Sequence, residues 1–253
     1  MIGDALRVRV WGPWACFTRP EFHVERVSYP VMTPSAARGV LEAILMQPIE
    51  KPDTAQRGNK IGFRWHVLRI GLLKKGLLVP IRRNELAYPA HGFEGYNVSA
   101  VRAQRSSLVL KDVEYLVEGV IEIPEGCGDP GGSAPIAKYQ GMFIRRAQNG
   151  QCYHRPYLGC REFPCHFEWA PGQEPEDERG HRIHETFGPM LRDFDFDPVW
   201  RCWPAGNARP ATWSKNGRKV SPVPKPFVAE AINGWITVAT VHESDGKREI
   251  RYP

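Results

Sequence analysis

Arginines that could bind the phosphates of a nucleic acid gather in two parts of this chain. One part runs from about residue 82 to residue 107, where aromatic side chains accumulate beside the basic ones, and the other is a basic stripe on a helix predicted near residue 145. Guanidinium groups neutralise phosphates and aromatic rings stack on unpaired bases, so this composition suits RNA. The candidate RNA-binding residues are Arg38, Arg82, Arg83, Arg102, Arg105, Arg145 and Arg146.

Enzymes that bind nucleotides or metal ions carry motifs that this chain lacks. It has no Walker loop, no GxGxxG, no GxSxG and no HExxH. His181 and His184 stand near Glu185, but such a pair in a polar segment is typical of solvated surface. We therefore predict neither a metal site nor a cofactor.

The cysteines do not have the spacing of a zinc site. Cys16, Cys127, Cys152, Cys160, Cys165 and Cys202 form no CxxC pair, and grouping three of them with His154 and His166 matches no standard ligand spacing. Disulfides are not expected in a cytosolic chain, so most of these residues are predicted to be small buried side chains.

Composition places the chain among globular proteins with an anionic partner. The net charge of +6 and the isoelectric point near 9.1 favour such a partner, although so modest a charge also fits ordinary surface. Neither an apolar leader nor a run of roughly 18 apolar residues is found. We expect a soluble, cytoplasmic protein without a membrane partner.

Two helices are predicted from apolar residues at helical spacing. The first begins near Pro34, with Thr33 as its cap, and its Gly39 suggests that a backbone or ligand comes close there. Arg38 and Glu42 are four residues apart on its wet side. The second helix runs from about Ile136 to Ala147.

Strands surround these helices. Alternation predicts strands at residues 6–10, 63–67 and 113–123 and in the segment 153–169, with aromatic and basic loops at residues 11–22 and 82–85 and a long loop or extended hairpin at 87–107. The order strand, helix, strand, strand, helix, strand is ferredoxin-like. The fold class is therefore α+β.

An acidic, proline-containing run at Glu174–Glu178 marks a domain boundary near residue 172. We predict a ferredoxin-like domain over residues 1–171 and a smaller β-rich domain over residues 172–253. In the second domain, Asn216-Gly217 is a hairpin signal, and strands are expected at 235–241 and 248–252.

Three strings, in this order, resemble one protein family. They are Thr33–Gly39 (TPSAARG, after SYPVM), Ile81–Glu85 (IRRNE) and Tyr157–Phe163 (YLGCREF). Together they resemble the CRISPR-associated RAMP proteins of the Cas-five family, subtype I-C variant, over residues 6 to about 170. The resemblance implies an RRM-like RAMP fold and a metal-independent endoribonuclease that cuts precursor CRISPR RNA at its repeat hairpin and stays on the 5′ handle. It also implies the other subunits of the surveillance complex as partners.

The resemblance also implies a catalytic set, which this chain retains in part. The family has a tyrosine late in the first helix and adjacent lysine and histidine on the second. These positions hold Leu45, Lys138 and Tyr139 here, so the implied catalytic residues are Lys138 and Tyr139. Lys138 could stabilise the charge on the phosphorus or protonate the leaving group. Tyr139 is a poor base unless a neighbouring cation lowers its pKa, and it also fits a core-facing aromatic.

Two other functions stay open at this point. The changes at Leu45 and Tyr139 favour a non-catalytic subunit that only grips the crRNA handle. A general binder of duplex nucleic acid, acting by charge and including double-stranded DNA among its partners, is the third possibility.

Overall fold

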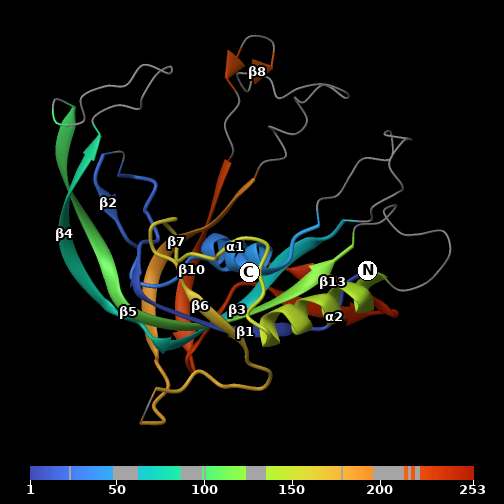
Figure 1. The fold of residues 1–253 in the computed structure, drawn as a ribbon. Helices are drawn as coiled ribbons and strands as arrows, with labels where there is room; N and C mark the ends of the chain where they lie inside the picture. Colours follow the sequence, from blue (N-terminus) through green and yellow to red (C-terminus); the bar gives the residue numbers. More distant parts are fainter. Residues whose placement is uncertain are drawn as a thin grey trace.

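The computed structural model describes residues 1–22, 24–47, 62–86, 99, 101–123, 135–177, 179–195, 214–215, 218–219 and 223–253. These residues form a large, curved, mostly antiparallel sheet with two helices (Figure 1). The elements are β1 (Leu6–Ala15), β2 (Arg26–Val27), α1 (Pro34–Ile44), β3 (Arg64–Lys74), β4 (Leu77–Leu86), β5 (Arg102–Glu122), α2 (Pro135–Gln148), β6 (His166–Trp169), β7 (Glu185–Asp195), β8 (Ser214–Lys215), β9 (Arg218–Lys219), β10 (Val223–Ile232), β11 (Trp235–Thr237), β12 (Thr240–Ser244) and β13 (Lys247–Arg251). The prediction of a strand-rich chain with few helices is confirmed.

Helix α1 begins and ends where its sequence signals place it. The Thr33 side chain accepts a hydrogen bond from the Ala36 backbone N–H at 3.4 Å, and Pro34 occupies the first turn. Leu45 adopts an extended conformation and ends the helix. No other part of the described backbone comes close to Gly39, because a Cβ atom built there would meet nothing within 4 Å, and the alternative of a ligand at this glycine stays a prediction.

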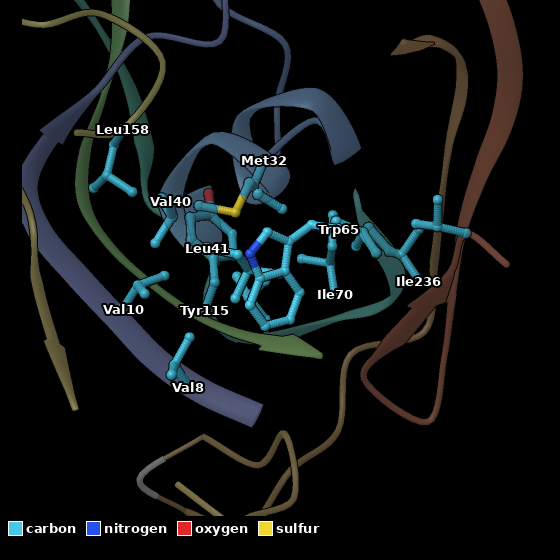
Figure 2. Close-up of a cluster of buried hydrophobic side chains, with 14 of the residues drawn as sticks. Val8, Val10, Met32, Val40, Leu41, Trp65, Ile70, Tyr115, Leu158 and Ile236 are labelled. Atoms are coloured by element: carbon cyan, nitrogen blue, oxygen red, sulfur yellow. The ribbon is translucent and has the colours of Figure 1, made fainter. Parts of the chain in front are cut away.

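The core fills the concave side of the sheet beneath α1 (Figure 2). Val8 and Val10 of β1 point to this side, and Trp65 and Ile70 of β3 meet them from the neighbouring part of the sheet. Val40 and Leu41 of α1 are 1% and 0% exposed, so the helix buries its apolar face against these strands.

The strands run in the order β6-β1-β5-β3-β11-β10-β7, with β2 and β4 also paired to β5. Strands from after residue 172 therefore continue the sheet, since β11 pairs with β3 at Trp235–Gly71. The division near residue 172 stays a prediction. The predicted strand 235–241 is interrupted between Thr237 and Thr240, while the strand expected near 248–252 is confirmed as β13.

Strand β4 and the first half of β5 form a two-stranded arm that rises from the sheet (Figure 1). Arg82–Glu85 lie in β4, so their prediction as a loop is wrong, and Arg102 and Arg105 lie in β5. For the described residues 102–107 of the predicted loop or hairpin, the extended hairpin is thus the correct alternative. The predicted loop residues 87–98 lie outside the described residues.

Two further strand predictions need correction. Strand β1 continues through Trp11 and Trp14 to Ala15, where a loop was expected. In the segment 153–169, the regular strand is confined to His166–Trp169, because Gly159 at φ +82° turns the chain before it. The predicted Asn216-Gly217 turn lies outside the described residues, although β8 and β9 on either side of it are paired. Neither described helix is long and apolar enough to cross a membrane.

Candidate functional site

Helix α2 presents Lys138 to solvent. Its side chain makes no hydrogen bond or ion pair with the described residues, and Arg145, seven residues later on nearly the same face, is also exposed. Two free cations on one stripe can bind a phosphodiester backbone. The helix ends as predicted, with Gly150 at φ +63°.

Tyr139, the next residue, lies on a different face of that helix and is half-buried against the core. Its ring is 4.9 Å from the ring of Phe63, and it packs with the cluster that includes Phe143. Burial raises the pKa of the Tyr139 phenol above its ordinary value. A lysine-assisted lowering of this pKa is therefore not found, which weakens Tyr139 as a general base.

The C-terminal end of α1 is held by α2 and the chain that follows it. Arg146 Nη1 donates to the Ile44 carbonyl at 2.7 Å, and the Tyr153 backbone N–H donates to the Ala43 carbonyl at 2.8 Å. These bonds satisfy carbonyls that the helix end would otherwise leave unpaired. Arg146 is thus a tether between helices, in addition to any contact with RNA. Leu45 is 3% exposed and belongs to the core.

Two aromatic side chains beside this helix end are the alternative candidates from the sequence if Lys138 is not catalytic. Tyr153 is 74% exposed, and the exposed His154 ring stacks on Tyr157 at 6.5 Å. Like Tyr153 and His154, Arg146 hydrogen-bonds to the C-terminal end of α1. It comes eight residues after Lys138, which is about 12 Å along the axis of α2. Tyr153 and His154 follow α2 closely in the chain, and this position is the sequence signal that makes them the next residues to test.

One face of the arm holds a cluster of charged side chains. Arg26 Nη1 donates to Glu162 Oε1 at 2.7 Å, and Arg83 pairs with the other oxygen of the same carboxylate. Arg105 lies directly opposite Arg83 and pairs with Glu85 at 3.7 Å. Residues from the strings 81–85 and 157–163 therefore meet here, 79 positions apart in the case of Arg83 and Glu162. Sequence reasoning missed Arg26 and Glu162 because nothing local indicates this pairing.

The other face of the arm carries unpaired cations. Arg82 and Arg102 are exposed and make no hydrogen bond or ion pair with the described residues. They stand opposite Ser106 and Leu86, respectively, in the ladder. The arm thus separates its four predicted RNA-binding arginines into two that are neutralised within the protein and two that are available to a ligand.

Arg38 is also neutralised within the protein. It pairs with Asp193 of β7 and, at 3.4 Å, with Glu42 one turn along α1. Burial raises the pKa of Glu42 although Arg38 opposes the shift. Arg38 therefore joins α1 to β7, and a ligand phosphate would have to compete with two carboxylates for it.

No group of three or more His, Cys, Asp and Glu side chains that could hold a metal ion occurs within the described part of the chain. The grouping of cysteines with His154 and His166 considered from the sequence is therefore not formed there. His181 instead pairs with Asp177 at 3.4 Å.

Comparisons with known proteins give one consistent family. A family model named Cas_Cas5d and described as CRISPR-associated protein (Cas_Cas5) matches residues 5–239. A Thermus thermophilus protein named CRISPR pre-crRNA endoribonuclease Cas5d is 41% identical over 239 residues, covering 92% of this chain and 90% of the relative. A protein of the same name from Mannheimia succiniciproducens is 34% identical over 212 residues, covering 78% and 87%. A crystal structure of a CRISPR-associated protein shares the fold, with a TM-score of 0.58, 19% identity and coverage of 99% and 98%.

Proposed function

Because the chain belongs to the Cas5d family of CRISPR-associated proteins, we propose that it is an endoribonuclease that cuts precursor CRISPR RNA at the repeat hairpin. The observation that carries this proposal is 41% identity across 92% of the chain to a relative named as such an enzyme. The free cations on α2 and on the arm support it, since they supply phosphate contacts in two places.

The cleavage proceeds without a metal ion in this proposal. The 2′-OH of the nucleotide before the cut loses its proton and attacks the adjacent phosphorus, and the bond to the 5′-oxygen breaks as that oxygen gains a proton. The products are a 2′,3′-cyclic phosphate and a 5′-hydroxyl. Lys138 stabilises the negative charge that grows on the phosphoryl oxygens or protonates the leaving oxygen. In-line positioning of the 2′-OH supplies much of the remaining rate.

After cleavage the protein stays on the 5′ handle and joins the other subunits of a type I-C surveillance complex. Its N-terminal part forms the ferredoxin-like RAMP domain of residues 1–171, and residues 172–253 form the β-rich remainder. The strand order β6-β1-β5-β3, with α1 and α2 between successive strands of the chain, supports this reading.

The purified protein is expected to cut its own repeat RNA at one position in excess EDTA. Gel analysis with and without phosphatase treatment would identify the 2′,3′-cyclic phosphate or the 3′-phosphate derived from it. A strict requirement for a divalent ion, or a 3′-hydroxyl product, would rule out this mechanism. Tight binding of the repeat without cleavage would instead identify a non-catalytic handle-binding subunit.

The two faces of the arm are expected to contribute differently to RNA binding. Because Arg82 and Arg102 have no partner among the described residues, Arg82→Ala and Arg102→Ala should each weaken binding similarly for all sequences and lower the slope of log Kd against log salt by about one. Titration of labelled repeat RNA at several salt concentrations measures this slope, and double-stranded DNA tested in parallel shows whether the same arginines bind it.

Arg83→Ala and Arg105→Ala are the matched controls, since they lie on the same two strands. Their charges already face Glu162 and Glu85, so each should change the salt slope by less than half as much and should lower the melting temperature instead. If all four variants change the slope of log Kd against log salt equally, the RNA contacts both faces of the arm alike and the prediction is wrong.

A further inference from the structure

Two cysteines from distant parts of the sequence meet at the base of the arm. Cys16 follows β1, and its backbone N–H donates to the Leu158 carbonyl at 3.0 Å. The thiol of Cys160 donates to the Cys16 carbonyl at 3.5 Å. Between them, Gly159 leaves no room for a side chain, because a Cβ atom there would lie 2.1 Å from the Cys16 carbonyl oxygen. The turn that carries Cys160 is therefore pressed against the end of β1.

The two sulfur atoms share their partners. Thr18 Oγ1 lies 3.8 Å from Cys16 Sγ and 3.7 Å from Cys160 Sγ, so one hydroxyl group contacts both thiols. Arg26 Nη1 is 4.0 Å from Cys160 Sγ. Cys160 Sγ also lies 3.5 Å from the Cys16 carbonyl oxygen, so the two cysteines are in direct contact, as the two residues of a disulfide must be.

Cys160 is the member of the pair suited to react first. It is only partly buried, whereas Cys16 is 1% exposed. Hydrogen bonds from Cys16 and Thr18 and the charge of Arg26 lower the pKa of Cys160, although burial opposes them. The hydrogen bond to Cys160, together with burial, raises the pKa of Cys16, which therefore keeps its proton. One thiolate beside one thiol is the arrangement of a reactive and a resolving cysteine.

We propose that Cys16 and Cys160 form a peroxide-reactive thiol pair that closes to a reversible disulfide. The Cys160 thiolate attacks one oxygen of hydrogen peroxide and, with one proton taken up, gives a sulfenic acid and water. The Cys16 sulfur then attacks the Cys160 sulfur, its proton leaves with the hydroxyl group as a second water, and the S–S bond forms. Two thiols are thus oxidised by one peroxide, and a dithiol reductant reverses the reaction.

The disulfide would fix the turn that carries Glu162 to the end of β1. Glu162 neutralises Arg26 and Arg83, so oxidation acts on the turn that supplies the counter-charge of these two arginines. This consequence is independent of cleavage, and the chemistry can be tested without RNA.

The test treats the full chain with stoichiometric hydrogen peroxide in a background in which Cys127 and Cys202, which lie outside the described residues, are serine. Peptide mass spectrometry should find a Cys16–Cys160 cross-link that dithiothreitol removes, with Cys165 still reduced because it is 3% exposed. Cys16→Ser should leave a Cys160 sulfenic acid that dimedone traps, and Cys160→Ser should leave Cys16 reduced.

Exposed Cys152 is the matched control for reactivity that follows solvent access alone. At pH 6, iodoacetamide should modify Cys160 about tenfold faster than Cys152, because an ordinary thiol is almost fully protonated there. Arg26→Gln keeps both cysteines and should reduce the ratio of the Cys160 rate to the Cys152 rate by several fold. This variant tests the proposal even if the serine variants fold poorly. Oxidation of Cys152 before Cys160, or the absence of the cross-link in the folded protein, would overturn the proposal.

Discussion

Lys138→Ala is expected to slow cleavage of the repeat RNA about a hundredfold or more while changing its affinity little, since the lost interaction forms mainly in the transition state. The side chain is exposed and has no partner among the described residues, so its removal breaks no contact within the fold. Single-turnover cleavage at saturating protein, with Kd measured separately, gives the two quantities. Cleavage at the wild-type rate would move the search to Tyr153 and His154.

Arg145→Ala is the matched control for this prediction. Arg145 lies on the same helix, carries the same charge and is equally unpaired, but it is two turns away from Lys138. Its loss should weaken binding and leave the rate at saturation unchanged. A comparable rate loss in both variants would mean that α2 positions RNA and performs no chemistry at Lys138.

Tyr139→Phe tests the second implied catalytic residue. The phenylalanine ring can keep its packing on Phe63, and the hydroxyl alone is removed. Because burial raises the pKa of this phenol, the cleavage rate should change far less than the roughly 10²-fold or greater loss that follows removal of a general acid or base. Melting curves for both proteins are needed, since a disordered α2 would imitate a catalytic defect.

Local signals in the sequence predicted both helices. Thr33 and Pro34 cap and start α1, and Gly150 ends α2, and each of these signals lies within a few residues of the helix end that it determines. The strands were harder, because their ladders join distant segments. Strand β1 was ended too early, since Trp11, Gly12 and Pro13 interrupt the alternation. Pro13 is tolerated because the pairing of β1 with β6 ends at Trp11.

The arm shows why the candidate site could be predicted only in part. Neither face of β4 buries a run of apolar side chains, so Arg82–Glu85 carry no strand alternation, and pairing with β5 alone makes them a strand. The sequence identified the arginines as basic residues, but it did not indicate which of them meet a carboxylate. That distinction depends on Glu162, which reaches the arm from a turn far along the chain.

On the convex face of the sheet, too, the charges of a single strand did not indicate which residues of other strands they would pair with. Arg7 and Arg9 alternate with apolar residues along β1, as Glu114, Glu118 and Glu122 do along β5, and the register of the two strands places Arg7 opposite Glu118. Glu118 accepts hydrogen bonds from Arg7 Nη2 at 2.6 Å and from Arg69 Nε at 2.8 Å. The two guanidinium groups also stack on Trp235, at 4.8 and 4.3 Å from its ring centre. This network joins four strands.

Glu118→Gln is expected to destabilise the protein by about 3 kcal/mol, because it removes the carboxylate that both arginines share in a largely buried site and leaves Arg7 with only the more distant Glu174, at 3.6 Å. The Glu118 side chain is 7% exposed and that of Arg7 is 12% exposed. Urea unfolding followed by tryptophan fluorescence measures the change. The matched control is Glu168→Gln on the same face. The Glu168 side chain is 48% exposed, so its ion pair with Arg9 should contribute at most about 1 kcal/mol.

The same network predicts how stability depends on pH. Burial tends to raise the pKa of Glu118, but hydrogen bonds from Arg69 and Arg7 outweigh it, and the pKa lies below its ordinary value. A carboxyl whose pKa is lower in the folded state contributes its full stability above the unfolded pKa, near 4.3, and loses it as the pH falls through the folded pKa. The wild-type protein should therefore lose stability below about pH 4 more steeply than Glu118→Gln, whose side chain does not titrate. Parallel curves for the two proteins would show that the carboxyl has the same pKa folded and unfolded, so that its attraction to Arg7 and Arg69 only compensates for its burial.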